Sequence, residues 1–147
     1  MMTPQQVHLI RKSFAELASH DHVAALVFYR RLFEIEPALR PLFKTDIEVQ
    51  AHKLLEMLGI LIAMVERPAG LDVELRAMGA RHRDYGVTDA HYGMVGEALL
   101  AMLAEVLDKR FTPEVRAAWT ALYHTVETKM KKGASDAEKA EAAATKV

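Results

Sequence analysis

The sequence contains no cysteine, which excludes disulfides and thiolate metal sites. It also lacks an excess of either charge. The 19 basic residues are scattered among 20 acidic ones, and the net charge is only -1. The concentrated basic surface that binding to a phosphate backbone requires is therefore missing, and we expect no nucleic-acid partner.

Targeting and membrane signals are absent as well. Residues 1–6 (MMTPQQ) lack the basic and apolar regions of a signal peptide. The longest apolar run, Met57 to Val65, is less than half of what a spanning helix needs. These features predict a cytoplasmic protein without membrane insertion.

Nucleotide-binding and hydrolase motifs are missing too, including G-x-G-x-x-G, the P-loop, H-E-x-x-H and G-x-S-x-G. Gly93 and Gly96 are instead two small residues on one helical face, which favours a close helix crossing over a phosphate loop. A chain of 147 residues with 51% hydrophobic content predicts one hydrophobic core.

Helical periodicity dominates what is present. Apolar residues recur at spacings of three and four, and no stretch alternates like a strand. Two segments, Thr3–Gln6 and Thr45–Glu48, match a capping box, and Pro113 follows Thr112 at a third helix start. The pattern predicts an all-α protein with helices over 4–18, 21–35, 46–66, 71–83, 89–108 and 113–132, and a helical corner at 36–42.

The last residues, 133–147, are rich in Ala, Lys and Glu and offer little apolar area for burial. We therefore expect one domain over 1–132, followed by a tail over 133–147 that is a frayed helix or disordered.

A histidine shares an inward stripe in the segment Leu71–Arg83. His82 follows Leu75, Met78 and Gly79 at helical spacing. A lone histidine on an apolar face is more often a core residue satisfied by a hydrogen bond than a ligand, so this position alone predicts only that an imidazole faces the core.

Two further polar residues fall on inward stripes. Gln50 is the only polar member of a stripe that runs from Ile47 to Leu61, and Tyr29 shares a face with apolar neighbours. Such groups need partners when buried. Eight methionines and several phenylalanines could line a pocket for a flat apolar cofactor, or could simply fill a helical core. The pattern thus indicates a helical domain and leaves its ligand open.

Four motifs resemble those of bacterial single-domain haemoglobins, which are relatives of the flavohaemoglobin globin domain: VFYRRLF at 27–33, EPALRPLF at 36–43, RHRDYGV at 81–87 and HYGMVG at 91–96. The resemblance spans about residues 3–132 and includes Trp119 and Tyr123. It implies a globin fold with helices packed three-over-three around a haem pocket. The cofactor would be haem b with its iron, held without a covalent bond.

The resemblance also implies roles for individual residues. His82 would be the proximal iron ligand, Tyr29 and Gln50 the distal polar pair, Phe43 and Leu54 would pack against haem and gas, and Tyr92 would lie on the proximal side. His52, about 200° around the helix from Gln50, should point away from the pocket. The basic residues Lys44, Lys53, Arg81 and Arg83 are candidates for binding the haem propionates.

One position departs from the family pattern. Flavohaemoglobin-type globins carry a glutamate late in the last helix that joins the proximal histidine and a tyrosine in a hydrogen-bonded trio. Tyr92 fits the tyrosine, but Ala134 stands where the glutamate would fall. This favours gas binding over peroxidase-like chemistry.

The resemblance implies reversible O₂ binding of high affinity and slow release, for storage, delivery or scavenging, with NO or CO as other ligands. The alternative is nitric oxide dioxygenase activity, which would need an external reductase because 147 residues hold no reductase domain. A haem-free helical signalling domain is a third possibility, since fold alone does not determine function.

Overall fold

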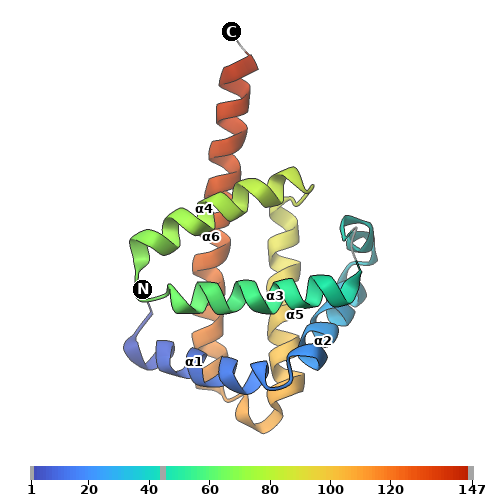
Figure 1. The fold of residues 1–147 in the computed structure, drawn as a ribbon, viewed down its shortest axis with the longest axis vertical. Coiled ribbons are helices and arrows are strands. Elements are labelled where there is room, and N and C mark those ends of the chain that lie inside the picture. Colours follow the sequence, from blue (N-terminus) through green and yellow to red (C-terminus); the bar gives the residue numbers. More distant parts are fainter. Residues whose placement is uncertain (1, 44–45, 146–147) are drawn as a thin grey trace.

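The computed structural model describes residues 2–43 and 46–145, and every regular element in these ranges is helical (Figure 1). The elements are α1 (Pro4–Ala18), α2 (Asp21–Ile35), the 3₁₀ helix η1 (Pro37–Leu42), α3 (Ile47–Ala63), α4 (Pro68–Asp84), α5 (Asp89–Leu107), the 3₁₀ turn η2 (Asp108–Arg110) and α6 (Pro113–Thr145). The predicted all-α class is confirmed.

Local capping explains where most helices begin. The Thr3 hydroxyl accepts from the backbone N–H of Gln6 at 3.1 Å, and the Gln6 side chain accepts from the N–H of Thr3 at 3.0 Å. This confirms the first capping box. At α3 the cap is Asp46, whose carboxylate accepts from the Glu48 N–H at 2.8 Å, whereas Thr45 lies outside the described residues.

Helix α4 begins three residues earlier than predicted, at Pro68. Proline suits the first turn because its ring fixes a helical φ and that position needs no N–H donor. The predicted start at Leu71 is wrong because it rested on the apolar stripe. The stripe begins at the first buried residue of the helix, which is Leu71, and the helix itself begins one turn earlier.

The helix α6 continues without a break through the predicted tail and ends at Thr145, and its last turns project from the body of the protein (Figure 1). Gly133, at the start of this segment, is buried. Residues 133–145 are therefore helical, while the domain boundary at 132 stays a prediction.

Helices α5 and α6 lie side by side, and α1, α3 and α4 cross them (Figure 1). Consecutive helices α3 and α4 use different partners: α3 packs on α2 and α1, and α4 packs on α6. Within the described ranges, the backbones of α3 and α4 make few or no close approaches, although both helices contribute side chains to one core cluster.

The core accordingly forms two clusters. The larger one joins α1, α2, α5 and α6 around the fully buried Trp119, whose indole N–H donates to the Ser13 hydroxyl at 2.8 Å. The smaller one lies beneath α4 and consists of Leu61, Leu71, Leu75, Met78, Tyr92 and Met130.

Together with η2, helix α5 has the length and hydropathy of a membrane span. Core helices of globular proteins pass the same test, and α5 buries residues along its length, including Tyr92, Leu99, Met102 and Leu107. Its apolar character is therefore explained by packing inside the protein.

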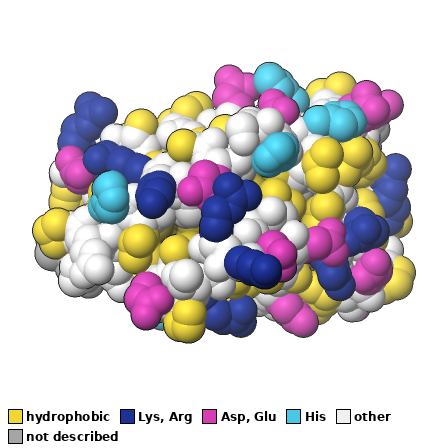
Figure 2. Space-filling model, turned by 90° about the horizontal axis from the view of Figure 1, so that it is seen from below, with side chains coloured by type: hydrophobic (Ala, Val, Ile, Leu, Met, Phe, Trp, Pro, Cys, Tyr) yellow, Lys and Arg dark blue, Asp and Glu magenta, His cyan; other side chains and the backbone are white. Residues whose placement is uncertain are grey.

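Figure 2 views the molecule from the end opposite the projecting part of α6. Acidic, basic and histidine side chains are interspersed there with apolar ones, and no large patch of one sign is visible on this face.

Candidate functional site

The proximal candidate, His82, lies half-buried near the end of α4. Its Nδ1 atom is 2.7 Å from the Met78 carbonyl oxygen, one helical turn earlier. Because a carbonyl only accepts hydrogen bonds, Nδ1 carries the proton and Nε2 holds the lone pair. This is the tautomer that a metal-binding imidazole requires at Nε2.

The electrostatic setting keeps this imidazole neutral. Burial lowers the pKa of His82 below 6.5, the Met78 hydrogen bond opposes the shift, and the nearby Arg81 lowers the pKa further. A neutral ring at physiological pH can donate its Nε2 lone pair to a metal without first losing a proton.

The distal candidate Tyr29 projects from α2 and is only 5% exposed. Its hydroxyl donates to the main-chain carbonyl of Gln50 at 3.3 Å. Burial raises the pKa of Tyr29 to about 12, so the phenol remains protonated and can act as a donor. The structure therefore brings the two predicted distal residues, Tyr29 and Gln50, into contact, although the contact is to the Gln50 backbone.

Aromatic rings enclose this hydroxyl-bearing side chain. The Tyr29 ring centroid lies 5.0 Å from that of Phe28, 6.0 Å from that of Phe33 and 5.2 Å from that of Phe43. Phe43 directly follows η1, so the helical corner brings it to α2. The result is a predominantly apolar surrounding for a single phenol donor.

The other predicted distal residues lie on α3. Gln50 and Leu54 are one turn apart and half-buried, and Leu54 packs against the larger core cluster. The side chain of His52 is 79% exposed and 3.9 Å from Glu56. This confirms that His52 lies on the outer face and fixes the helical register in favour of Gln50.

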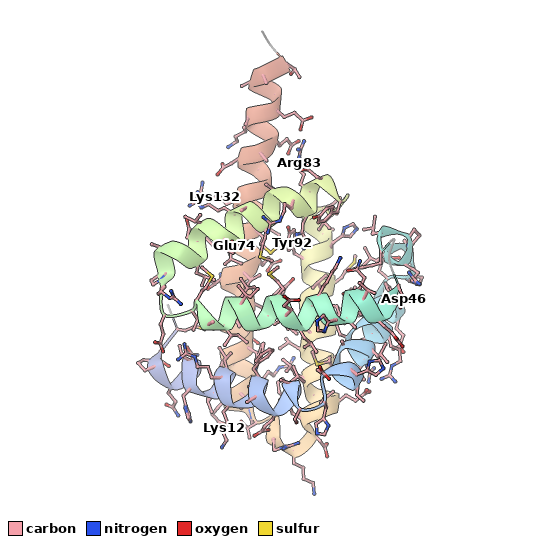
Figure 3. All side chains as sticks on the ribbon, in the orientation of Figure 1. Lys12, Asp46, Glu74, Arg83, Tyr92 and Lys132 are labelled. Carbon is pink, nitrogen blue, oxygen red and sulfur yellow. The ribbon has the colours of Figure 1, made fainter. Side chains whose placement is uncertain are left out.

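Tyr92 is 5% exposed and belongs to the smaller cluster beneath α4. Figure 3 places it on α5 at the level between α3 and α4. Its hydroxyl has no hydrogen-bond partner among the described residues. Burial, together with Asp89 and Glu127, raises the pKa of Tyr92, so this hydroxyl is also a neutral donor.

One of the two carboxylates that act on this tyrosine is engaged elsewhere. Glu127 pairs with Lys131 at 3.1 Å, and the Lys131 ammonium lies 5.8 Å from the Tyr92 ring centroid. Ala134 lies one turn further along α6 and is half-buried. Among the described groups, the His82 side chain thus makes its one hydrogen bond by donating from Nδ1 to a backbone carbonyl.

The propionate candidates lie in different settings. Arg81 pairs with Glu74 at 3.4 Å, and Arg83 pairs with Glu141 at 2.6 Å. Lys53 is exposed, and Lys44 lies outside the described residues. The Arg83 partner was missed at the sequence level because it lies 58 residues away, and the only signal for it was the charge of the tail.

Burial of Tyr29 has a measurable consequence at alkaline pH. Its pKa rises from 10.0 to about 12 on folding, so its contribution to stability is complete below pH 10 and is lost as pH rises to about 12. Two pKa units correspond to about 2 to 3 kcal/mol. We expect the wild type to lose that much more unfolding free energy than Tyr29→Phe over this range, measured by urea titration. If the unfolding free energies of the wild type and of Tyr29→Phe change equally with pH, the prediction is contradicted.

Comparison with known families matches residues 26–130 to the globin family. The match covers well over half of the chain, and the protein therefore belongs to the globin family. The predicted globin fold, with its helical layers, is confirmed.

Similar proteins include a flavohemoprotein of Rhizobium meliloti (29% identical, 84% of this chain) and leghemoglobin-1 of Lupinus luteus (27% identical, 93% of this chain and 98% of the relative). The chain spans only 31% of the length of the flavohemoprotein. An anaerobic nitrite reductase of Oryza sativa is 27% identical over 88% of this chain and 96% of its own length.

Among solved structures, the chain is similar to a carbene transferase engineered from a Rhodothermus marinus protein assigned as a nitric oxide dioxygenase. The TM-score is 0.85 at 28% identity, covering 97% of this chain and 99% of the other.

As a globin, the protein binds haem with iron and takes diatomic gases as ligands. The donor set fits this group. His82 offers a neutral ring with Nδ1 engaged and Nε2 available. Met78, whose carbonyl accepts from Nδ1, belongs to the same buried cluster as Tyr92, whose hydroxyl has no partner among the described residues. The absence of cysteine excludes the thioether attachment of a c-type haem.

Proposed function

We propose that this globin binds O₂ reversibly, with high affinity and slow release, for storage, delivery or scavenging. In this proposal His82 is the proximal ligand, and Tyr29 and Gln50 face the gas. Ferrous haem supplies an iron that binds O₂, NO or CO and shifts charge onto O₂. The observation that carries the proposal is the buried, neutral Tyr29 hydroxyl lying against Gln50.

The phenol is well suited to stabilise a partly negative gas ligand. Its present bond to the Gln50 carbonyl is 3.3 Å long, beyond the usual 2.5–3.0 Å of a good O–H···O hydrogen bond. Exchanging this weak bond for one to a partly charged acceptor therefore costs little and gains more. The rings of Phe28, Phe33 and Phe43 surround the Tyr29 side chain, which is only 5% exposed.

This role predicts that Tyr29→Phe releases O₂ about 10- to 100-fold faster, because a hydrogen bond to a charged acceptor contributes about 1.5–3 kcal/mol. Stopped-flow displacement of O₂ by CO measures the rate. Tyr85→Phe is the matched control, because Tyr85 is 61% exposed and loses only a solvated hydroxyl. An unchanged O₂ release rate in Tyr29→Phe would overturn the assigned distal role.

A second function, nitric oxide dioxygenation, is favoured by the similarity to a structure assigned that activity and to a flavohemoprotein. Combining NO with O₂ to give nitrate consumes one electron per turnover, so an external reductase would be the partner. NO consumption should continue beyond one equivalent only when a reductase and NADH are added. If NO consumption stops after one equivalent both with and without the reductase and NADH, dioxygenation is contradicted and only reversible gas binding is supported.

A further inference from the structure

The helix that carries His82 depends on α6 for its position. Helix α4 packs along α6 and has no comparable packing on α3 or α5 within the described parts of the chain. Between its end at Asp84 and the start of α5 lies Gly86, with a φ of +93°. Whatever holds α6 against α4 therefore sets where the imidazole lies.

Two glycines bring the helix backbones into direct contact. A Cβ atom at Gly79 of α4 would overlap the Met130 carbonyl of α6, and a Cβ atom at Gly133 of α6 would overlap the Arg76 carbonyl of α4. The second contact is made by the first residue of the segment 133–145. This segment therefore takes part in the tightest part of the crossing.

Ion pairs continue the contact towards His82. Lys129 pairs with Asp72 at 2.8 Å, and further along the crossing Asp136 lies 3.6 Å from Arg76. Arg83, next to His82 in the chain, pairs with Glu141 at 2.6 Å. Figure 3 shows Arg83 where α4 passes the projecting part of α6.

We propose that residues 133–145 are a positioning element for the proximal histidine, acting through the backbone contact at Gly133 and the Arg83–Glu141 ion pair. The inference rests on the proposed role of His82 as iron ligand. The Nδ1 bond to the Met78 carbonyl ties the ring to the α4 backbone. A tilt of the C-terminal end of α4 therefore reorients the imidazole and changes its bond to iron.

The test compares holoproteins by resonance Raman spectroscopy of the Fe–His stretch in the ferrous, gas-free state, and by the rate of haem loss to an excess acceptor globin. Glu141→Gln should shift the Fe–His band and accelerate haem loss by up to about fivefold, the upper range for an exposed ion pair. Deletion of residues 135–147 should shift the band further. Glu141→Asp, which keeps the carboxylate as a partner for Arg83, should return both readouts towards wild type.

Glu66→Gln is the matched control. Its carboxylate pairs with Arg11 at 2.8 Å and is 63% exposed, as is that of Glu141, but it precedes the N-terminal end of α4, whereas His82 lies near the C-terminal end. It should leave the Fe–His band unchanged. An unchanged band in both Glu141→Gln and the deletion variant would overturn the positioning role, as would an equal shift in Glu66→Gln. An Fe–His band that persists in His82→Ala would instead overturn the proposed function.

Discussion

His82→Ala is expected to abolish the Soret spectrum of a histidine-ligated haem when the purified protein is supplied with haemin. The imidazole is neutral, and Met78 holds its Nδ1, so the ring is already arranged to use Nε2. Alanine removes this donor and leaves α4 without an imidazole at this position.

Absorption titration with haemin, followed by gel filtration, measures the loss. The matched control is His52→Ala, because His52 is 79% exposed on the outer face of α3 and should bind haem as the wild type does. Added imidazole should restore the spectrum of His82→Gly by entering the vacated space. Full retention of the wild-type spectrum in His82→Ala would contradict the proximal assignment.

The sequence predicts most of the fold because most of its signals are local. The cap at Thr3 and the proline Pro113 mark helix starts where they were predicted, and both signals act within one helical turn. The stripes identify the inward residues for the same reason. Helix α3 ends at Ala63, earlier than predicted, because its last apolar residues continue into a turn whose burial resembles that of the helix.

Contacts between residues far apart in the sequence produce no local pattern from which they could be predicted. The stripes predict that Tyr29 and Gln50 share a cavity, but they do not reveal that the phenol meets the main-chain carbonyl of Gln50. The composition of the segment 133–145 predicts no packing against the rest of the protein, because Ala, Lys and Glu offer little apolar area. Its anchor is instead the backbone of Gly133 and a salt bridge to Arg83, neither of which produces an apolar pattern.

The residues of the proposed site lie on helices that pack on different partners. Helices α2 and α3 carry Tyr29 and Gln50, whereas α4 carries His82 and rests on α6. In the proposed function, the distance between the distal pair and His82 would therefore depend on both the α2–α3 and the α4–α6 packing. Substitutions at the α4–α6 crossing should alter haem binding without touching any residue of the pocket.

Gly79→Ala tests that crossing with the largest expected effect on stability. The added methyl would overlap the carbonyl of Met130, and backbone atoms cannot move aside by changing a rotamer. The helices would have to separate, which also opens the contact at Gly133. We expect a loss of about 2 to 4 kcal/mol in unfolding free energy, measured by urea denaturation of the apoprotein, as is typical of overpacking in a tight core.

Gly93→Ala provides the matched control within the same chain. Gly93 is also helical, but a Cβ atom there meets no other atom within 4 Å. Alanine should therefore stabilise the protein by up to about 1 kcal/mol, through its higher helix propensity. Opposite signs for the two substitutions would show that the backbone contact at Gly79, and not the general preference for alanine in helices, determines the result. Equal stabilisation by both would contradict a close α4–α6 crossing.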